Sequence, residues 1–125
     1  PYVNGTGGAA VASGANGLDT NIFLLSCYEV GWTTSNSGFI TVDGACLSYF
    51  SGMAETDAKR IGYLNGTATR WWLRDPRSGS RNAWFVEVDG SHDYSEVPNN
   101  FGVRPALILD SNAIFDTETL ILKGV

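Results

Sequence analysis

The chain has 125 residues, a length that suits one domain, and its 43% of hydrophobic residues exclude a disordered polypeptide. Its net charge of −5 argues against a nucleic-acid-binding protein, because phosphate binding needs a basic surface. No stretch approaches the roughly 20 apolar residues that cross a bilayer, so the sequence predicts no membrane-spanning segment.

The first part of the chain predicts an arm and then the first ordered elements. Residues 1–17 are mostly Gly, Ala, Ser and Asn, which is typical of a flexible arm or a linker remnant, so we expect the domain itself to span residues 18–125. The apolar run at 22–25 predicts a buried strand. Ser26 can then cap a short helical turn that ends at Gly31.

Helices are expected in the middle of the chain. Residues 32–42 are rich in Thr, Ser, Asn and Gly and predict a long loop. From Leu47 to Leu64, apolar side chains recur at three- and four-residue spacings, which predicts one or two short amphipathic helices with an interruption at 51–52. The Asn-Gly pair at 65–66 is expected to end this helical part.

The second half predicts an antiparallel sheet. Strands are expected at residues 69–74, 83–88 and 102–109, followed by a closing hairpin over 114–122. Residues 91–100 are polar and rich in turn formers, so we expect a long loop there. Pro105 removes a backbone donor, so the third strand is an edge strand or carries a bulge. Helices followed by a sheet indicate the α+β class.

Two cysteines, Cys27 and Cys46, can form a disulfide or remain small buried thiols. The apolar neighbours of each cysteine favour buried thiols. No Cys-x-x-Cys pair or Cys/His cluster is present, so no metal site is predicted. The two Asn-Gly-Thr sequences, which begin at Asn4 and Asn65, match a glycosylation sequon, and we interpret them as ordinary Asn-Gly turns.

Half of the chain's lysines and arginines lie within twelve residues, namely Arg70, Arg74, Arg77 and Arg81. With the interleaved tryptophans they can be interpreted as a base-stacking surface. Because the acidic chain repels polyanions, we favour ion pairs between two or more of these arginines and the carboxylates of Asp75, Glu87 or Asp89.

Four residues of the predicted sheet are expected to have structural roles. Trp71 and Trp72 cannot both face the core, because neighbouring side chains of a strand point to opposite faces. One should fill the core, and the other should pack under a loop or line a binding face. Arg74 and Arg104 lie in or beside apolar runs, so we expect both guanidinium groups to be partly buried and paired with carboxylates or carbonyl groups.

Three segments in order, 71–76, 82–90 and 102–107, resemble one uncharacterised domain family of phage and surface proteins of Gram-positive bacteria. The family's usual patterns are Trp-Trp-Leu-Arg-Ser-Pro, an Ala-x-x-Val strand that ends in Gly, and Gly-Val-Arg-Pro-Ala. Asp75 stands here where the family usually has Ser. That family is similar to the C-type-lectin-like domains related to the formylglycine-generating enzyme. The resemblance implies short helices followed by a twisted antiparallel sheet with long loops.

Some of those lectin-like domains carry a face of residues that phage retroelements diversify, just before the final strand. The resemblance places the corresponding ligand-binding face between Pro76 and Gly102, where Tyr and Trp supply rigid contact area and Ser and Asn supply adaptable hydrogen bonds. The residues expected to bind ligand are Arg77, Ser78, Ser80, Arg81, Asn82, Trp84, Glu87, Ser91, His92, Asp93, Tyr94, Ser95, Glu96, Asn99 and Asn100.

The resemblance implies a recognition domain at the C-terminal end of a phage tail protein or a surface protein, on the virion or the bacterial cell surface. Its expected partner is a protein or glycan of the host-cell surface. The upstream portion of its own chain and further copies of the chain are also expected as partners, whereas nucleic acid, membrane and cofactors are not. The alternative role is structural, in virion assembly or capsid decoration.

No catalytic residues are predicted. The single histidine, His92, lies in a polar segment beside Asp93, which favours a surface histidine, and no Gly-x-Ser-x-Gly elbow is present. The carboxylates of Asp89, Asp93 and Glu96 are close along the chain and leave a glycoside hydrolase as the last-ranked function. The calcium motif of sugar-binding lectins, Glu-Pro-Asn, is interrupted here by Val97, which argues against a calcium site.

Overall fold

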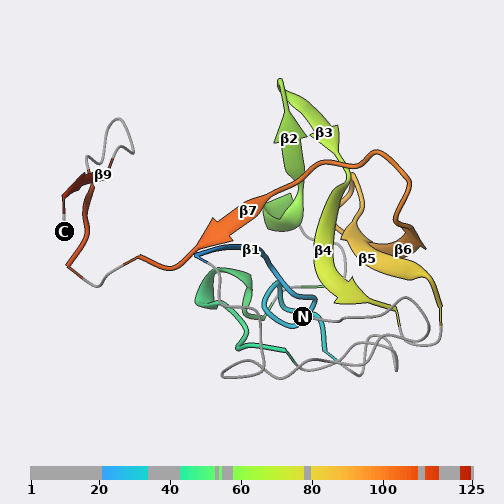
Figure 1. Cartoon of the computed structure of the whole chain (residues 1–125), viewed down its shortest axis with the longest axis horizontal. Coiled ribbons are helices and arrows are strands. Elements are labelled where there is room, and N and C mark those ends of the chain that lie inside the picture. The colour runs from blue at the N-terminus through green and yellow to red at the C-terminus, as the bar shows by residue number, and fades with distance from the viewer. Residues whose placement is uncertain are drawn as a thin grey trace.

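The computed structural model describes residues 21–33, 43–52, 54, 58–77, 80–109, 112–115 and 122–124. In these segments the chain forms short strands and two single turns of 3₁₀ helix (Figure 1). The strands are β1 (Ile22–Leu24), β2 (Gly62–Leu64), β3 (Thr67–Thr69), β4 (Trp71–Pro76), β5 (Asn82–Val86), β6 (His92–Glu96), β7 (Pro105–Leu107), β8 (Ile114–Phe115) and β9 (Leu122–Gly124). The 3₁₀ turns are η1 (Ser48–Phe50) and η2 (Ala58–Arg60).

The central sheet is antiparallel and has the strand order β4-β5-β6. Trp71 lies opposite Val86 in its register, and Trp84 lies opposite Tyr94. Alternate residues of β4 are buried, which places the side chains of Trp71, Leu73 and Asp75 on the core face. The register of β4 against β5 shifts after Trp72, so the strand bends before it reaches Pro76.

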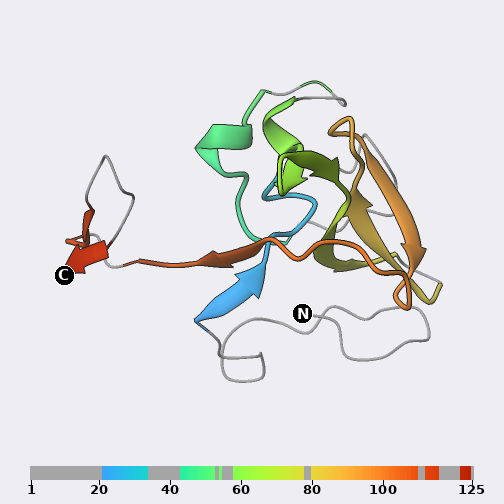
Figure 2. The same cartoon turned by 90° about the horizontal axis from the view of Figure 1, so that it is seen from above.

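The other strands form two-stranded antiparallel pairs. β1 pairs with β7, and Leu24 lies opposite Pro105. β2 and β3 form a hairpin that projects beside the upper end of β4 (Figure 1). The β8–β9 pair lies away from the central sheet in both views (Figure 2). Because β7 has β1 as its one strand partner among the described residues, the prediction that Pro105 lies in an edge strand is confirmed.

The core lies against one face of the central sheet and is dominated by aromatic side chains. It contains Leu25, Cys27, Val30, Trp32, Phe50, Trp71, Leu73, Trp84 and Val86. Arg60 is fully buried beside it, where Nε donates to the carbonyl of Val30 at 2.7 Å and Nη1 donates to the carbonyl of Ala54 at 2.7 Å. Its guanidinium also stacks 4.5 Å from the ring centroid of Trp32.

The predicted α+β, C-type-lectin-like fold is wrong, because the described residues form antiparallel sheets with helical turns of only three residues each. The apolar spacing between Leu47 and Leu64 predicted amphipathic helices, but η1 and η2 each end after one turn. Gly52, just after η1, has a φ of +71°, a left-handed conformation that breaks a helix. Residues 62–64 belong to a strand instead of a helix.

The helical turn predicted after Ser26 forms, but it does not extend into a helix. The hydroxyl of Ser26 accepts a hydrogen bond from the amide of Glu29 at 3.0 Å, and the Glu29 carboxylate accepts one from the amide of Ser26 at 2.9 Å. This reciprocal pair is a capping box. Gly31, with a φ of +90°, ends the turn as predicted.

Three strands, β2, β3 and β6, were not predicted. The Asn-Gly pair at 65–66 was expected to end a helix, yet both residues have positive φ, 52° and 80°, and they form the two-residue turn between β2 and β3. The segment 91–100 was expected to be a loop, but residues 92–96 form β6. The predicted arm, residues 1–17, lies outside the described residues.

Candidate functional site

The predicted ligand-binding face is divided between two sides of the central sheet. Along β6, neighbouring side chains point to opposite faces, so His92 and Tyr94 share the core side with Trp84, whereas Asp93 shares the outer side with Phe85. The predicted set therefore does not form one continuous surface. Ser78 lies outside the described residues.

Trp84 belongs to the core and not to an exposed surface. It is 3% exposed, and its ring lies 5.3 Å from the ring of His92 and 5.4 Å from that of Tyr94. His92 also packs 5.0 Å from the ring of Trp32, so the expected surface histidine is instead half-buried between two tryptophans. These contacts stabilise the sheet beneath Tyr94.

Several of the predicted polar residues hold turns in place. The hydroxyl of Ser80 donates to the carbonyl of Arg77, and the amide and hydroxyl of Ser91 both donate to the carboxylate of Asp89. The Asn99 amide donates to the hydroxyl of Ser95 at 2.5 Å. These side chains satisfy local hydrogen bonds, as turn residues commonly do.

An exposed stack remains on the predicted face. The guanidinium of Arg77 lies 4.1 Å from the ring centroid of Tyr94, whose side chain is exposed. Arg81, Asp93, Glu96, Asn99 and Asn100 are also exposed, whereas Asn82 and Glu87 are half-buried. Among the described residues of the predicted set, Tyr94 is thus the exposed aromatic side chain.

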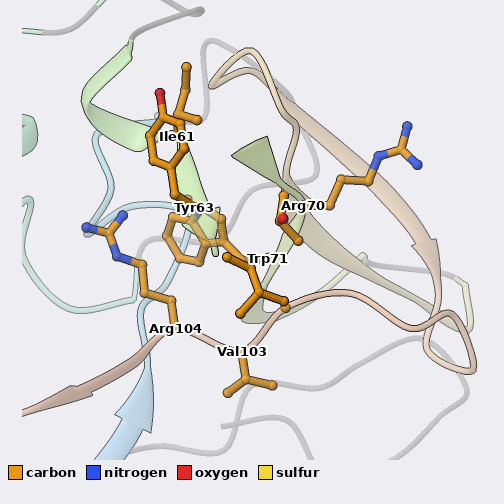
Figure 3. Close-up of a pocket in the computed structure, with 10 residues that line it drawn as sticks. Ile61, Tyr63, Arg70, Trp71, Val103 and Arg104 are labelled. Carbon is orange, nitrogen blue, oxygen red and sulfur yellow. The ribbon is translucent and has the colours of Figure 1, made fainter. Parts of the chain in front are cut away.

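A different part of the surface is hollowed. Residues 61–64, 69–71 and 102–104 line an open hollow of about 440 Å³ between the β2–β3 hairpin and the segment that leads into β7 (Figure 3). This volume falls in the range of small-molecule sites. Sequence reasoning missed the hollow, and it includes two residues, Trp71 and Arg104, that were predicted to be structural.

Two close backbone approaches build the hollow. Gly102 forms a parallel bridge with Trp71: its amide donates to the carbonyl of Arg70 at 2.7 Å, and its carbonyl accepts from the amide of Trp72 at 3.0 Å. A Cβ on Gly102 would lie 3.0 Å from the carbonyl oxygen of Arg70, and a Cβ on Gly62 would lie 2.6 Å from Cδ1 of Trp71. Both positions therefore need glycine to bring their segments together.

Trp71 is the floor of the hollow. It is 2% exposed, and its indole N–H donates to the carbonyl of Arg60 at 2.9 Å, which fixes the orientation of the ring. Trp72 points to the opposite side of the sheet and packs 4.6 Å from the ring of Phe101 and 5.8 Å from that of Phe85. The prediction that one tryptophan fills the core and the other packs under a loop is thus confirmed.

Arg104 does not have the buried, paired environment that the sequence predicted. It is exposed, and its guanidinium lies 5.1 Å from the ring centroid of Trp71. No carboxylate of the described residues forms an ion pair with it. The prediction failed because Pro105 begins an edge strand whose flanking residues are exposed, so no neighbouring sheet covers Arg104.

Arg70 is engaged on the outer side of the sheet. Its Nε donates to both carboxylate oxygens of Glu87, at 2.9 and 3.0 Å, and this hydrogen bonding raises the pKa of Arg70. The guanidinium also lies 5.5 Å from the ring of Phe101. Figure 3 shows it pointing away from the other labelled side chains of the hollow. Of the predicted pairs of two or more arginines with Asp75, Glu87 or Asp89, the structure shows this one pair among the described residues.

Arg74 has the structural role predicted for it, with other partners than those expected. Its guanidinium donates to the Glu29 carboxylate at 2.6 Å, to Asp43 at 2.8 Å and to the carbonyl of Leu24 at 2.8 Å. Burial opposes the charge, but these hydrogen bonds raise the pKa of Arg74 above its usual value. The same contact lowers the pKa of Asp43.

A buried carboxyl group and a buried thiol lie next to this ion-pair cluster. The Asp75 carboxylate accepts a hydrogen bond from the amide of Cys27 at 2.6 Å, and burial raises its pKa to about 6. Burial likewise raises the pKa of the Cys27 thiol. Both cysteines are free, and Cys27 is buried as predicted, but Cys46 is exposed.

Residues 1–111 match DUF6273, a domain of unknown function. The chain belongs to this family. The hollow and the central sheet lie within the matched residues of DUF6273, whereas β8 and β9 lie beyond them. No curated protein and no solved structure matches the chain.

The described residues contain no group of three or more His, Cys, Asp or Glu side chains placed to hold a metal ion. They also contain no helix long and apolar enough to cross a bilayer.

The hollow depends on residues whose partners are distant in sequence. Tyr63 and Val103, exposed by 66% and 68%, stand at its rim, and neither belonged to the predicted binding set. The Asn-Gly turn at 65–66 was a signal for the hairpin that carries Tyr63. No sequence signal shows that Gly102 pairs with Trp71 and so brings Val103 to the same rim.

Proposed function

We propose that this DUF6273 domain is a non-catalytic recognition domain that binds its ligand in the hollow above Trp71. One observation carries the proposal: an exposed guanidinium, that of Arg104, is held over the Trp71 ring without a carboxylate partner among the described residues. A cationic group that is already positioned loses little freedom when it binds an anion. Tyr63 and Val103 supply exposed apolar surface beside it.

The hollow has the rigid support that a binding site needs. Trp71 is anchored through its indole N–H, and the two glycines hold the walls close to it. Binding residues commonly lie on loops and short elements that a rigid sheet positions. Val103 and Arg104 lie on such a connection, between the parallel bridge at Gly102 and β7.

We place the domain at the end of a phage tail protein or a bacterial surface protein, with a protein or glycan of the host-cell surface as its ligand. The motif segments that resemble phage and surface proteins of Gram-positive bacteria support this location. Diversification of the 77–100 loops was implied by the lectin-like fold, and with that fold contradicted it stays a prediction without structural support.

A cell-binding experiment tests the site. Fluorescently labelled domain is incubated with a panel of intact Gram-positive cells, and Arg104→Gln is compared with the wild type and with Tyr94→Ala. Loss of a charge-assisted hydrogen bond costs about 1.5–3 kcal/mol, so we expect binding to weaken about tenfold or more in Arg104→Gln. Tyr94→Ala, which changes the Arg77–Tyr94 stack, should bind as the wild type does. If Tyr94→Ala weakens binding and Arg104→Gln does not, the ligand binds at residues 77–100 and not in the hollow. If the wild-type domain binds to no cell, the proposal is contradicted.

A second function, in assembly, is favoured by a separate observation. Ile22 lies directly opposite Leu107 in the β1–β7 pair, and both side chains are largely exposed, as are Ile108 and Ile114. Exposed apolar side chains that lie opposite each other in a strand pair, as Ile22 and Leu107 do, are typical of surfaces that other chains cover. Sedimentation of the domain across concentrations, compared with Ile108→Asp, tests this function: a wild type that stays monomeric at every concentration contradicts it.

A further inference from the structure

We infer that the ligand group bound in the hollow is a single carboxylate carried on a sugar ring, as in an acidic monosaccharide unit of a surface glycan. This inference rests on the proposed function and gives the chemical class of its ligand. It follows from three features: the exposed guanidinium of Arg104, the charged groups around that guanidinium, and the exposed apolar side chains at the rim of the hollow.

The cation favours a carboxylate. A guanidinium offers two parallel N–H donors that match the two oxygens of a carboxylate. Arg104 is exposed, and its guanidinium carbon lies 5.1 Å from the ring centroid of Trp71, within the range of a cation–π contact. In the described part of the chain, no protein carboxylate occupies those donors.

The surrounding charge favours one carboxylate and not a polyanion. The other arginine at the hollow, Arg70, is already bound to both oxygens of Glu87 and points away from the labelled side chains (Figure 3). The chain as a whole has a net charge of −5, which repels nucleic acids and highly sulfated glycans. The one available guanidinium, that of Arg104, can therefore bind a single carboxylate, whereas the net negative charge of the chain disfavours a ligand with many negative charges.

The rim favours a ring with an apolar face. Tyr63 on the hairpin is exposed by 66%, and Val103, exposed by 68%, belongs to the segment that lines the opposite wall of the hollow. The C–H face of a sugar ring can pack on an exposed aromatic ring such as that of Tyr63. Thr69 Oγ1 donates its proton to the carbonyl of Thr67 and can still accept a hydrogen bond from a sugar hydroxyl. A volume of about 440 Å³ accommodates a sugar unit.

A peptide carboxylate is less well suited to the hollow. Extended peptides commonly bind by adding a strand to a sheet edge, which supplies main-chain hydrogen bonds. Both strands of the hairpin that borders the hollow, β2 and β3, are only three residues long, so the edge they offer is short. An acidic peptide is therefore the alternative that the experiment must separate from the sugar.

The experiment measures binding by NMR, using the Nε–H signal of Arg104 and the ring signals of Tyr63. The probes are methyl glucuronide, its neutral counterpart methyl glucoside, acetate, inorganic phosphate and a short Glu-containing peptide. We expect methyl glucuronide to bind about tenfold more tightly than any other probe. In Arg104→Gln the two sugars should bind equally, and Arg104→Lys should recover part of the difference. Tyr63→Ala should weaken both sugars, and Tyr94→Ala should change neither.

The outcomes separate the inference from the proposed function. Equal binding of the two sugars by the wild type, or tighter binding of phosphate, acetate or the peptide, overturns the acidic-sugar class. So does an absence of binding by methyl glucuronide. If the Arg104→Gln domain has lost its binding to cells in the same series, the proposed function stands while the ligand class is wrong. Unfolded variants are recognised beforehand from their amide spectra, and Arg104→Lys then replaces Arg104→Gln.

Discussion

The guanidinium of Arg104 lies 5.1 Å from the ring centroid of Trp71, although the two residues are far apart in sequence. The parallel bridge between Trp71 and Gly102 creates this relationship, because it brings the segment that follows Gly102 next to Trp71, the first residue of β4. The arginine is thus placed by backbone pairing and not by an ion pair. This distinguishes it from Arg70 and Arg74, which both have carboxylate partners.

Replacing Arg74 should destabilise the protein much more than replacing Arg70. The Arg74 side chain is 18% exposed, and Arg74→Ala would leave the carboxylate of Glu29, whose side chain is 13% exposed, without its cation, at a cost of about 3 kcal/mol. Arg70→Ala breaks an ion pair whose arginine is 48% exposed, at a cost of about 0–1 kcal/mol. Urea unfolding of both variants measures the difference. Equal losses would show that the cluster around Arg74 contributes little.

Asp75 should make the protein less stable as the pH rises from about 4 to about 6. Its pKa is about 6 in the folded chain, against an ordinary value of 3.8, so in this range the folded state holds a proton that the unfolded state has lost. The free energy of unfolding therefore falls with rising pH, by about 3 kcal/mol in total for a shift of this size. Above the folded pKa both states are ionised and the decrease stops.

Asp75→Asn tests this effect, because an amide oxygen can still accept the hydrogen bond from the amide of Cys27. Urea unfolding at pH values between 4.5 and 7.5 should show a flatter dependence in the variant than in the wild type. Asp43, whose pKa is lowered by Arg74, acts in the opposite direction and only as the pH falls below its ordinary value of 3.8. Parallel curves for the two proteins would show that Asp75 titrates normally.

Strong local signals in the sequence predicted part of this fold correctly. The apolar run that begins at Ile22 and the Asp-Gly turn after β5 predicted strands whose bounds are close to those observed. The first of them, β1, is not buried as predicted, because Ile22 is 64% exposed. The helices failed because apolar spacing between Leu47 and Leu64 also fits two 3₁₀ turns and a strand, and the spacing alone cannot distinguish them. β6 was missed because it is an edge strand whose exposed residues, such as Asp93 and Glu96, are polar.

The candidate site was harder to predict than the strands. Trp84 was expected at the surface because its segment lay between framework motifs, but the alternation along β5 places it in the core. The hollow needs Gly62 near Trp71 and Gly102 near Arg70, and both contacts are tertiary. A sequence shows that a glycine is present, but it does not show which chain segment approaches it.

Gly62→Ala should disturb the floor of the hollow. The added Cβ would lie 2.6 Å from Cδ1 of Trp71, so either the hairpin or the indole ring must move. Overpacking of this kind costs about 1–3 kcal/mol, and the shift should also weaken the hydrogen bond between the indole N–H and the carbonyl of Arg60. The indole N–H signal of Trp71 in NMR spectra checks this directly, and an unchanged signal would contradict the close packing.

The two thiols should differ widely in reactivity. Thiolates are the reactive form, and burial raises the pKa of Cys27, whereas Cys46 is exposed. In the folded protein we expect iodoacetamide at pH 8 to alkylate Cys46 at least about tenfold faster than Cys27, because burial both disfavours the Cys27 thiolate and keeps the reagent from it. Mass spectrometry of peptides from a time course measures both rates. In urea the rates should converge, and a Cys27 that reacts as fast as Cys46 in the native protein would show that the turn at 26–31 opens readily.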